Sequence, residues 1–170
     1  IVNVGDGNPT PRKNALFQHN IAKYVMLPVN ARVRRPIVED RLIKLSDYSN
    51  TFRYNKMFSG KGELGIISSG VTYQYVREIF PDASFLKLTM TYPLPLKLIL
   101  QFAEKVKKLI VVEELDPFLQ EHVQAMGIKV SGKEFIPKVG ELNPLIIEES
   151  AISAGLLKSL KQKTAFNPPN

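Results

Sequence analysis

The hydrophobic residues of this chain fall into short runs that alternate with stretches of helical spacing. Three runs, at 64–67, 84–90 and 109–112, are dominated by apolar residues and bounded by turn residues. Runs of this length are typical of strands that are buried on both faces, as parallel strands are. Between them, apolar residues recur every three or four positions, which predicts amphipathic helices packed on the strands.

The third run shows how a strand is expected to pass into a helix. Two acids follow Val112, and then comes Asp116-Pro117. An Asp that accepts from first-turn amides, with Pro at the first helical position, is a strong signal for a helix start. In the same way, Ser69 or Thr72 is expected to cap the helix after the first run. Asn143-Pro144 predicts a last helix that extends to Leu160.

This alternation predicts an α/β fold with three layers, α/β/α, around a mostly parallel open sheet of four or five strands. Residues 128–130 are expected to add a short strand. A weak strand at 51–57 is joined by a short turn to the run at 64–67, so the two are expected to pair antiparallel at an edge of the sheet. A helix that precedes this strand is expected to begin at Pro36.

Composition places the chain among globular proteins, since 44% of its 170 residues are hydrophobic. No apolar run approaches the roughly 18 residues of a membrane-spanning helix, and no signal-peptide pattern opens the chain. The absence of cysteine excludes disulfides, thiol nucleophiles and iron–sulfur or zinc–thiolate sites within these residues. We therefore expect a cytoplasmic protein without a membrane partner. Because the first residue is not Met, the chain is expected to be a piece of a longer protein.

The net charge of +7 is distributed unevenly. Residues 1–62 carry 11 Lys/Arg and 4 Asp/Glu, whereas residues 63–150 carry 9 and 12. Nucleic-acid binding requires a basic stripe with aromatic platforms on the folded surface. Here the basic charge lies in an amino-terminal arm and the predicted α/β body is slightly acidic, so nucleic acid is not an expected partner.

Ligands of open α/β sheets meet the carboxyl ends of the strands. The candidates there are suited either to a contact between domains or to a weak anion site: Ser68, Ser69, Gly70, Thr72, Thr91, Tyr92, Glu113, Glu114 and Asp116. Hydroxyls and helix amides at Ser68–Thr72 can hold an anion, which leaves open a free-standing module that binds a phosphate-containing ligand. Glu113 and Glu114 are neighbours on a strand and point to opposite faces, so they are not expected to act as an acid/base pair.

Nothing in the sequence predicts a catalytic, cofactor-binding or metal-binding residue. The two histidines, His19 and His122, have no partners at metal-ligand or catalytic-triad spacing. Gly60-x-Gly62-x-x-Gly65 matches the dinucleotide fingerprint in spelling, but it precedes a strand, whereas the mechanism requires it to follow one.

Five strings, in one order, resemble a known family: Lys23–Arg32, Glu63–Tyr73, Leu86–Pro95, Leu109–Phe118 and Val139–Pro144. Together they resemble the alpha subunit of indolepyruvate ferredoxin oxidoreductase, among the thiamine-diphosphate-dependent 2-oxoacid:ferredoxin oxidoreductases, over roughly residues 21–162. The resemblance implies the middle, transketolase-C-terminal-like domain alone. It divides the chain into an irregular arm or linker at 1–32, this domain at 33–162, and a linker at 163–170 to an absent downstream domain.

For the full protein, the resemblance implies oxidative decarboxylation of aryl pyruvates to aryl-acetyl-CoA with ferredoxin as electron acceptor. The implied cofactors are thiamine diphosphate, magnesium, iron–sulfur clusters and coenzyme A. This chain lacks the family's cysteine string, and Asp6-Gly7-Asn8 spells only a fragment of its magnesium motif. We therefore expect a non-catalytic, inactive domain without cofactors of its own. Its expected partners are the other domains of the alpha subunit and a beta subunit, with ferredoxin serving the full protein.

Overall fold

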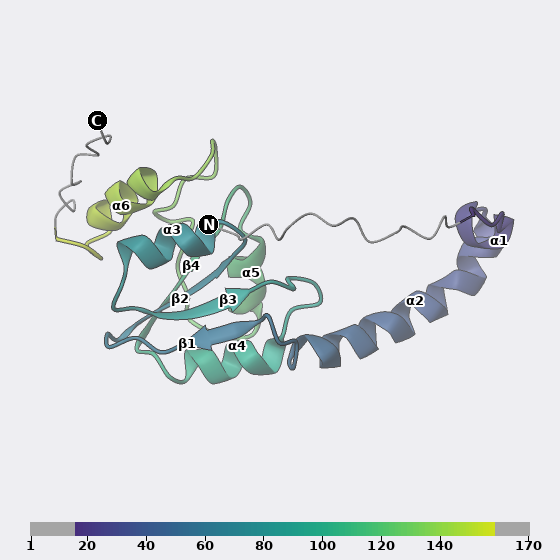
Figure 1. Ribbon diagram of the computed structural model, residues 1–170, viewed down its shortest axis with the longest axis horizontal. Coiled ribbons are helices and arrows are strands. Elements are labelled where there is room, and N and C mark those ends of the chain that lie inside the picture. The colour runs from purple at the N-terminus through teal and green to yellow at the C-terminus, as the bar shows by residue number, and fades with distance from the viewer. Residues whose placement is uncertain (1–15, 159–170) are drawn as a thin grey trace, which may run out of the picture. The chain divides into compact units, whose positions relative to one another are not determined.

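The computed structural model describes residues 16–158, and the chain divides into two compact units, residues 1–40 and 41–170. Figure 1 shows the elements of each unit. Three features expected from the sequence lie outside the described residues. They are Asp6-Gly7-Asn8, Leu160 and the segment 163–170.

The described part of the first unit is helical. Helix α1 spans Ile21–Tyr24, and the side chain of Asn20 caps it by accepting from the Lys23 amide at 2.9 Å. Helix α2 spans Pro28–Ser49, beginning in the first unit and ending in the second. The expected start at Pro36 was wrong, because the helix starts two turns earlier. Pro28 fits the first helical position, which needs no amide hydrogen, and Pro36 removes only one bond from an exposed stretch of helix.

The second unit is built on a four-stranded sheet of order β1-β3-β2-β4. Strands β2 (Leu64–Ser69), β3 (Ser84–Leu88) and β4 (Lys108–Val112) are parallel, and β1 (Lys56–Phe58) pairs antiparallel with β3 at one edge. Ile66 of the central strand is opposite Phe85 on one side and Ile110 on the other. The predicted mostly parallel sheet with one antiparallel edge strand is confirmed.

The partner of the edge strand differs from the expectation. Strand β1 pairs with β3 and not with β2, because both edges of β2 are taken by parallel neighbours. The connecting turn lies against the segment before β3: the Gly62 amide donates to the Asp82 carbonyl at 2.8 Å. At Gly60 a Cβ would lie 2.2 Å from the Ala83 carbonyl oxygen, so this close approach requires glycine.

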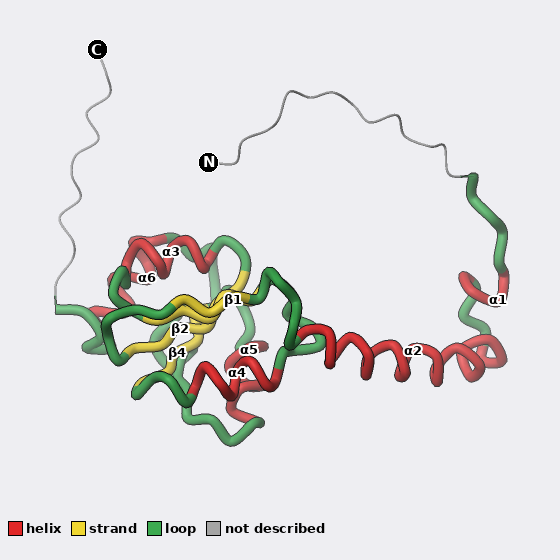
Figure 2. Tube along the Cα trace, turned by 60° about the horizontal axis from the view of Figure 1, so that its bottom comes forward, coloured by secondary structure: helices red, strands yellow, loops and turns green. Residues whose placement is uncertain are grey.

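Helices cover both faces of the sheet, which confirms three layers. On one face, α3 (Thr72–Ile79) and α6 (Pro144–Ser153) enclose one apolar cluster, and on the other α4 (Leu96–Ala103) and α5 (Phe118–Ala125) enclose a second (Figure 2). Successive strand residues alternate between the clusters, as the pleat requires: Ile66 lies in the first and Ile67 in the second.

Two further expectations were wrong in extent. Residues 128–130 form no strand in the described chain; the residue after them, Ser131, forms one isolated parallel bridge with Ile110. Helix α6 ends at Ser153, well before Leu160, because Gly155 adopts φ +67° and turns the backbone so that the Leu156 amide bonds back to Ala151. Its start is as predicted, since the Asn143 side chain accepts from the Ile146 amide at 3.0 Å.

Candidate functional site

Three loops follow the carboxyl ends of the parallel strands β2, β3 and β4. They are residues 68–72, 89–95 and 113–117, and we call them together the rim. Parallel strands end at the same edge of a sheet, so the rim gathers segments that are far apart in sequence. A shallow pocket of about 250 Å³ lies there. Its lining includes six of the residues expected from the sequence: Ser69, Gly70, Thr72, Thr91, Glu113 and Glu114.

The other three predicted residues lie apart from this pocket. Ser68 is fully buried, and its hydroxyl has no hydrogen-bond partner within residues 16–158. Tyr92 and Asp116 belong to the rim but are exposed and do not line the pocket. The rim is therefore a surface with a small hollow in it, rather than a set of groups converging on one point.

The start of α3 is not capped as expected. Val71 occupies the cap position in helical conformation, and no described side chain bonds the first-turn amides of α3. Gly70 adopts φ +59°, so the backbone turns sharply between strand and helix and carries both hydroxyls away from capping geometry. The predicted cap by Ser69 or Thr72 was wrong.

Helix α5 is capped by Glu113, not by Asp116. The two carboxylate oxygens of Glu113 accept from the backbone amides of Leu119 at 2.8 Å and Gln120 at 3.0 Å. Leu115 adopts φ +55°, and the Asp116 carbonyl accepts a hydrogen bond from the Phe118 amide. The chain therefore turns back on itself, and the longer side chain of Glu113 at the strand end reaches the helix. Burial raises the pKa of Glu113, although the two amides and nearby Lys133 oppose this shift.

A partly buried polar network ties the loop after residue 130 to the rim. Lys133 Nζ donates to the Glu113 carbonyl at 2.5 Å, and its amide donates to Gln120 Oε1 at 2.7 Å. The Gln120 amide group and the Gly132 backbone amide donate to the carboxylate of Glu134 at 2.8 and 2.6 Å. Burial lowers the pKa of Lys133, and the Gly132 amide lowers the pKa of Glu134.

The carboxylates of Glu113 and Glu114 are engaged with separate parts of the backbone. Glu113 holds α5, and Glu114 Oε1 accepts from the Leu142 amide at 3.2 Å in the segment that leads to α6. Both groups line the pocket; both oxygens of Glu113 accept hydrogen bonds, and one oxygen of Glu114 does. The geometry accordingly suits loop fixation better than proton transfer between the two acids.

The pocket is a poor match for a diphosphate. Three of the residues at its walls could favour an anion, namely the hydroxyl-bearing Ser69, Thr72 and Thr91. The charged residues of the three rim loops are all acidic, however, and two of them line the pocket. A phosphate there would face like charge, because the nearby cation, Lys133, lies outside the three loops and already donates to the Glu113 carbonyl, which is unfavourable.

Two asparagines that the sequence did not single out organise the approach to the rim. Buried Asn55 accepts from the amides of Thr89 and Met90 at 2.8 and 3.0 Å, just past β3. Asn50 Oδ1 accepts from the Lys97 amide at 2.9 Å in the first turn of α4. Their partners lie more than thirty positions away, so no spacing rule could have identified them.

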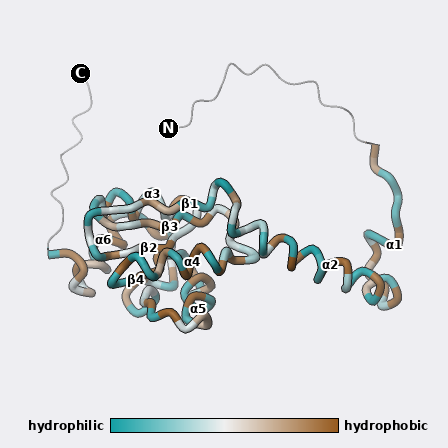
Figure 3. The backbone as a smooth tube through the Cα atoms, turned by 90° about the horizontal axis from the view of Figure 1, so that it is seen from below, coloured by the Kyte–Doolittle hydropathy of each residue, from teal (hydrophilic) through white to brown (hydrophobic). Residues whose placement is uncertain are grey.

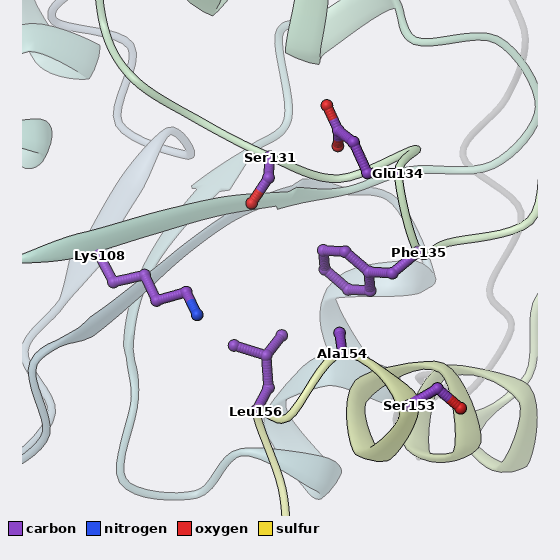
Figure 4. Close-up of a pocket in the computed structure, with 7 residues that line it drawn as sticks. All are labelled: Lys108, Ser131, Glu134, Phe135, Ser153, Ala154 and Leu156. Atoms are coloured by element: carbon purple, nitrogen blue, oxygen red, sulfur yellow. The ribbon is translucent and has the colours of Figure 1, made fainter.

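A larger cavity of about 510 Å³ lies at the other end of β4, where Lys108 is the first residue (Figure 4). The Lys108 amine and the Ser131 hydroxyl point toward Leu156, beside the ring of Phe135. The lining of this cavity mixes charged, hydroxyl and apolar groups, and no motif in the sequence predicted the cavity.

The described residues offer no sign of a metal centre. No group of three or more His, Asp or Glu side chains among residues 16–158 could hold a metal ion. His122 lies exposed on α5, with Nδ1 2.7 Å from the Phe118 carbonyl oxygen and its ring 4.4 Å from that of Phe118. In the same part of the chain no helix is long and apolar enough to traverse a bilayer.

Comparison with known proteins gives a consistent set of relatives. No family model matches the chain. It is similar to the indolepyruvate oxidoreductase subunit IorA of Archaeoglobus fulgidus, with 42% identity over 114 residues, covering 64% of this chain and 18% of the relative. The subunit of the same name from Thermococcus kodakarensis is 30% identical over 144 residues, covering 77% of this chain and 22% of the relative. That of Methanothermobacter thermautotrophicus is 29% identical over 164 residues, covering 88% of this chain and 26% of the relative. The chain thus spans about a fifth to a quarter of the length of these relatives.

A solved structure shares the fold. It is a 2-oxoglutarate:ferredoxin oxidoreductase from Magnetococcus marinus, with 2-oxoglutarate, coenzyme A and succinyl-CoA bound. The TM-score is 0.52 at 19% identity, over 78% of this chain and 24% of that one. At this identity the likeness concerns the fold alone.

Proposed function

We propose, from the relationship of this chain to one segment of the IorA subunits of indolepyruvate oxidoreductases, that it is a non-catalytic assembly domain of such a subunit. The matches cover most of this chain but only a small part of each relative, as expected of one domain among several. We assign the domain to residues 33–162, flanked by linkers. In this role the domain positions its neighbours through the rim and leaves the chemistry to the rest of the enzyme.

The exposed apolar residues of the rim and the adjoining turn of α5 are the observation on which this proposal depends. Val71, Tyr92, Leu115 and Phe118 expose between 40% and 62% of their surface around the pocket. An apolar patch surrounded by polar groups is typical of a surface that another protein covers. The loops beneath it are fixed by Glu113 and the Lys133 network, so the surface is preorganised for such a contact.

The cofactors and other partners belong, in this proposal, to the rest of the enzyme. The parent would bind thiamine diphosphate, magnesium, iron–sulfur clusters and coenzyme A outside this chain, in the cytoplasm. It would decarboxylate aryl pyruvates oxidatively and pass the electrons to ferredoxin. The poor match of the rim to a diphosphate and the absence of cysteine agree with a domain that holds none of these groups. The rim would contact other domains of the alpha subunit or a beta subunit.

Two experiments test the assembly role. The chain alone, supplied with indolepyruvate, all four cofactors and ferredoxin, should show no turnover; turnover would overturn the proposal. In the second, the Archaeoglobus fulgidus subunit receives this chain in place of its matching segment, and assembly with its partner subunit is measured by gel filtration. Leu115→Asp in the inserted segment should abolish assembly, whereas Val139→Asp, at an even more exposed apolar site outside the rim, should not. Equal assembly of the two variants would exclude the rim as the contact.

One observation favours a second function, a free-standing module that binds a phosphate-containing ligand at Ser68–Thr72. No described side chain caps α3; the Gln74 and Tyr75 amides donate to the Val71 carbonyl, which leaves the Thr72 and Tyr73 amides at the helix start for an anion. Isothermal titration calorimetry with nucleotides and coenzyme A distinguishes the two functions. Micromolar binding that Thr72→Ala weakens would support the module; no heat at millimolar ligand would exclude it.

A further inference from the structure

We propose that the cavity at the amino end of β4 is a binding site for a small organic acid, a molecule with one carboxylate and an apolar body. We call it the β4 cavity (Figure 4). It lies at the opposite end of β4 from the rim, and all the residues that line it belong to the second unit. Its volume of about 510 Å³ is typical of small-ligand sites, which combine apolar walls with a few placed polar groups.

One amine and one hydroxyl supply the free polar groups of the β4 cavity. Within residues 16–158, neither the Lys108 amine nor the Ser131 hydroxyl forms a hydrogen bond or an ion pair. Figure 4 shows both groups pointing into the space beside Leu156. The hydroxyl of Ser153 also belongs to the lining, but it donates to the Glu149 carbonyl of its own helix at 3.0 Å. An ammonium and a hydroxyl are donors that suit the two oxygens of a carboxylate.

The apolar side of the β4 cavity is held in place by the core. Phe135 and Leu156 both pack against the buried cluster beneath α3 and α6. The Phe135 amide donates to the Gly132 carbonyl at 3.1 Å, and the Leu156 amide donates to the Ala151 carbonyl at 2.8 Å, so turns of the backbone fix both residues. Walls that are already ordered reduce the entropy lost on binding. An aromatic ring opposite a branched side chain favours a ligand whose body is itself aromatic.

The charge around the β4 cavity favours an anion. A second hollow of about 400 Å³ shares Lys108 and Ser131 with it, and Lys107 and Lys129 also line this hollow. These lysines accompany the hydrophilic stretch that precedes the apolar run of β4 (Figure 3). Lys107 is paired with Glu63, whereas Lys108 and Lys129 have no ion-pair partner in the part of the chain that the structure describes. Positive charge near the mouth of a cavity attracts anions to it.

Glu134 is the only acid among the described residues that line the β4 cavity, and its carboxylate is engaged elsewhere. It accepts from the Gln120 side-chain amide at 2.8 Å and from the Gly132 backbone amide at 2.6 Å. Figure 4 shows this carboxylate pointing upward, apart from the Lys108 amine. One free amine beside an apolar wall suits a monoanion with an apolar body, whereas inorganic phosphate would leave the wall uncovered.

The experiment titrates the full 170-residue chain with 3-phenylpropionate and follows its backbone amide resonances by NMR. We expect saturable shifts at residues 131–136 and 153–156, with a Kd of about 1 mM, as is usual for so small a ligand. The neutral isostere 3-phenylpropionamide should bind at least about tenfold more weakly, because it lacks the charge that the Lys108 amine meets. The inference does not use the assembly role, so the hybrid-subunit test and this titration can fail independently.

Two variants separate a specific site from general attraction to positive charge. Lys108→Met removes the amine from the β4 cavity, and Lys129→Met makes the same change of charge in the neighbouring hollow. Both side chains are exposed, so both variants should fold. Lys108→Met should weaken binding of 3-phenylpropionate at least about tenfold, and Lys129→Met by less than about threefold.

Three results would overturn the proposal. One is the absence of saturable shifts at 20 mM 3-phenylpropionate, and another is an equal loss of affinity in the two variants. The third is inorganic phosphate binding as tightly as 3-phenylpropionate, because charge alone would then account for the affinity and the apolar wall would contribute nothing.

Discussion

Replacement of Glu113 by alanine removes both hydrogen bonds that cap α5. The Leu119 and Gln120 amides that it accepts from belong to residues that are 2% and 5% exposed, so water cannot easily take its place. Loss of a helix cap costs about 0.5–2 kcal/mol, and a buried unsatisfied donor costs roughly 1–3 kcal/mol. Removal of the buried Glu113 carboxylate also removes the cost of burying its charge, which offsets part of the lost stability. We therefore expect the free energy of unfolding to fall by about 2–3 kcal/mol.

The assay is urea unfolding of the 170-residue chain, followed by far-UV circular dichroism at pH 7. The midpoint should fall with little change in slope, since the same surface is exposed on unfolding. The corresponding decrease in Tm is roughly 4–12 °C for a chain of this size.

Asp116→Ala is the matched control, because the sequence predicts Asp116 as the cap whereas the structure gives this role to Glu113. The exposed Asp116 side chain caps nothing in α5, so its loss should cost no more than about 0.5 kcal/mol. A larger loss for Asp116→Ala than for Glu113→Ala would refute the reasoning.

The remaining predictions concern other parts of the same fold. Asn55→Ala leaves two backbone amides after β3 unbonded and should cost about 2 kcal/mol in urea unfolding, and a cost near zero would contradict this. Gly132→Ala places a Cβ 2.5 Å from the Val111 carbonyl oxygen and should lower Tm by roughly several degrees. An unchanged Tm would show that the backbone can move apart at this contact without cost. Ser68→Ala removes a buried hydroxyl without a described partner, so stability should stay the same or rise by up to about 1 kcal/mol, and a clear loss would reveal a hidden partner. Burial raises the pKa of Glu113, so the folded state keeps the proton of this carboxyl to higher pH than the unfolded state does. The free energy of unfolding of the wild type should therefore fall relative to that of Glu113→Gln as pH rises from 4.5 through the raised pKa. A difference between the two proteins that does not change with pH would contradict the shift.

The rim could be located from the sequence, but its contacts could not. The runs at 64–67, 84–90 and 109–112 predicted which loops share one edge, since parallel strands end together. Six of nine expected residues line one pocket for this reason. The cap of α5 was assigned to the wrong acid, because the backbone curl at Leu115 that brings Glu113 to the helix is a tertiary outcome with no short-range signal.

By itself, the sequence determined the α/β class, the parallel core, the antiparallel edge strand and the Asn143 cap, because these follow from hydrophobic period and from contacts within a few residues. Only the tertiary structure decided which strand the edge pairs with, and it also decided where Asn55 and Lys133 place their hydrogen bonds. The pairing of β1 with β3, the bond from the Thr89 amide to Asn55 and the bond from the Lys133 amine to the Glu113 carbonyl each join residues twenty or more positions apart. At that separation the free energy depends on how whole elements pack, and local propensity carries no information.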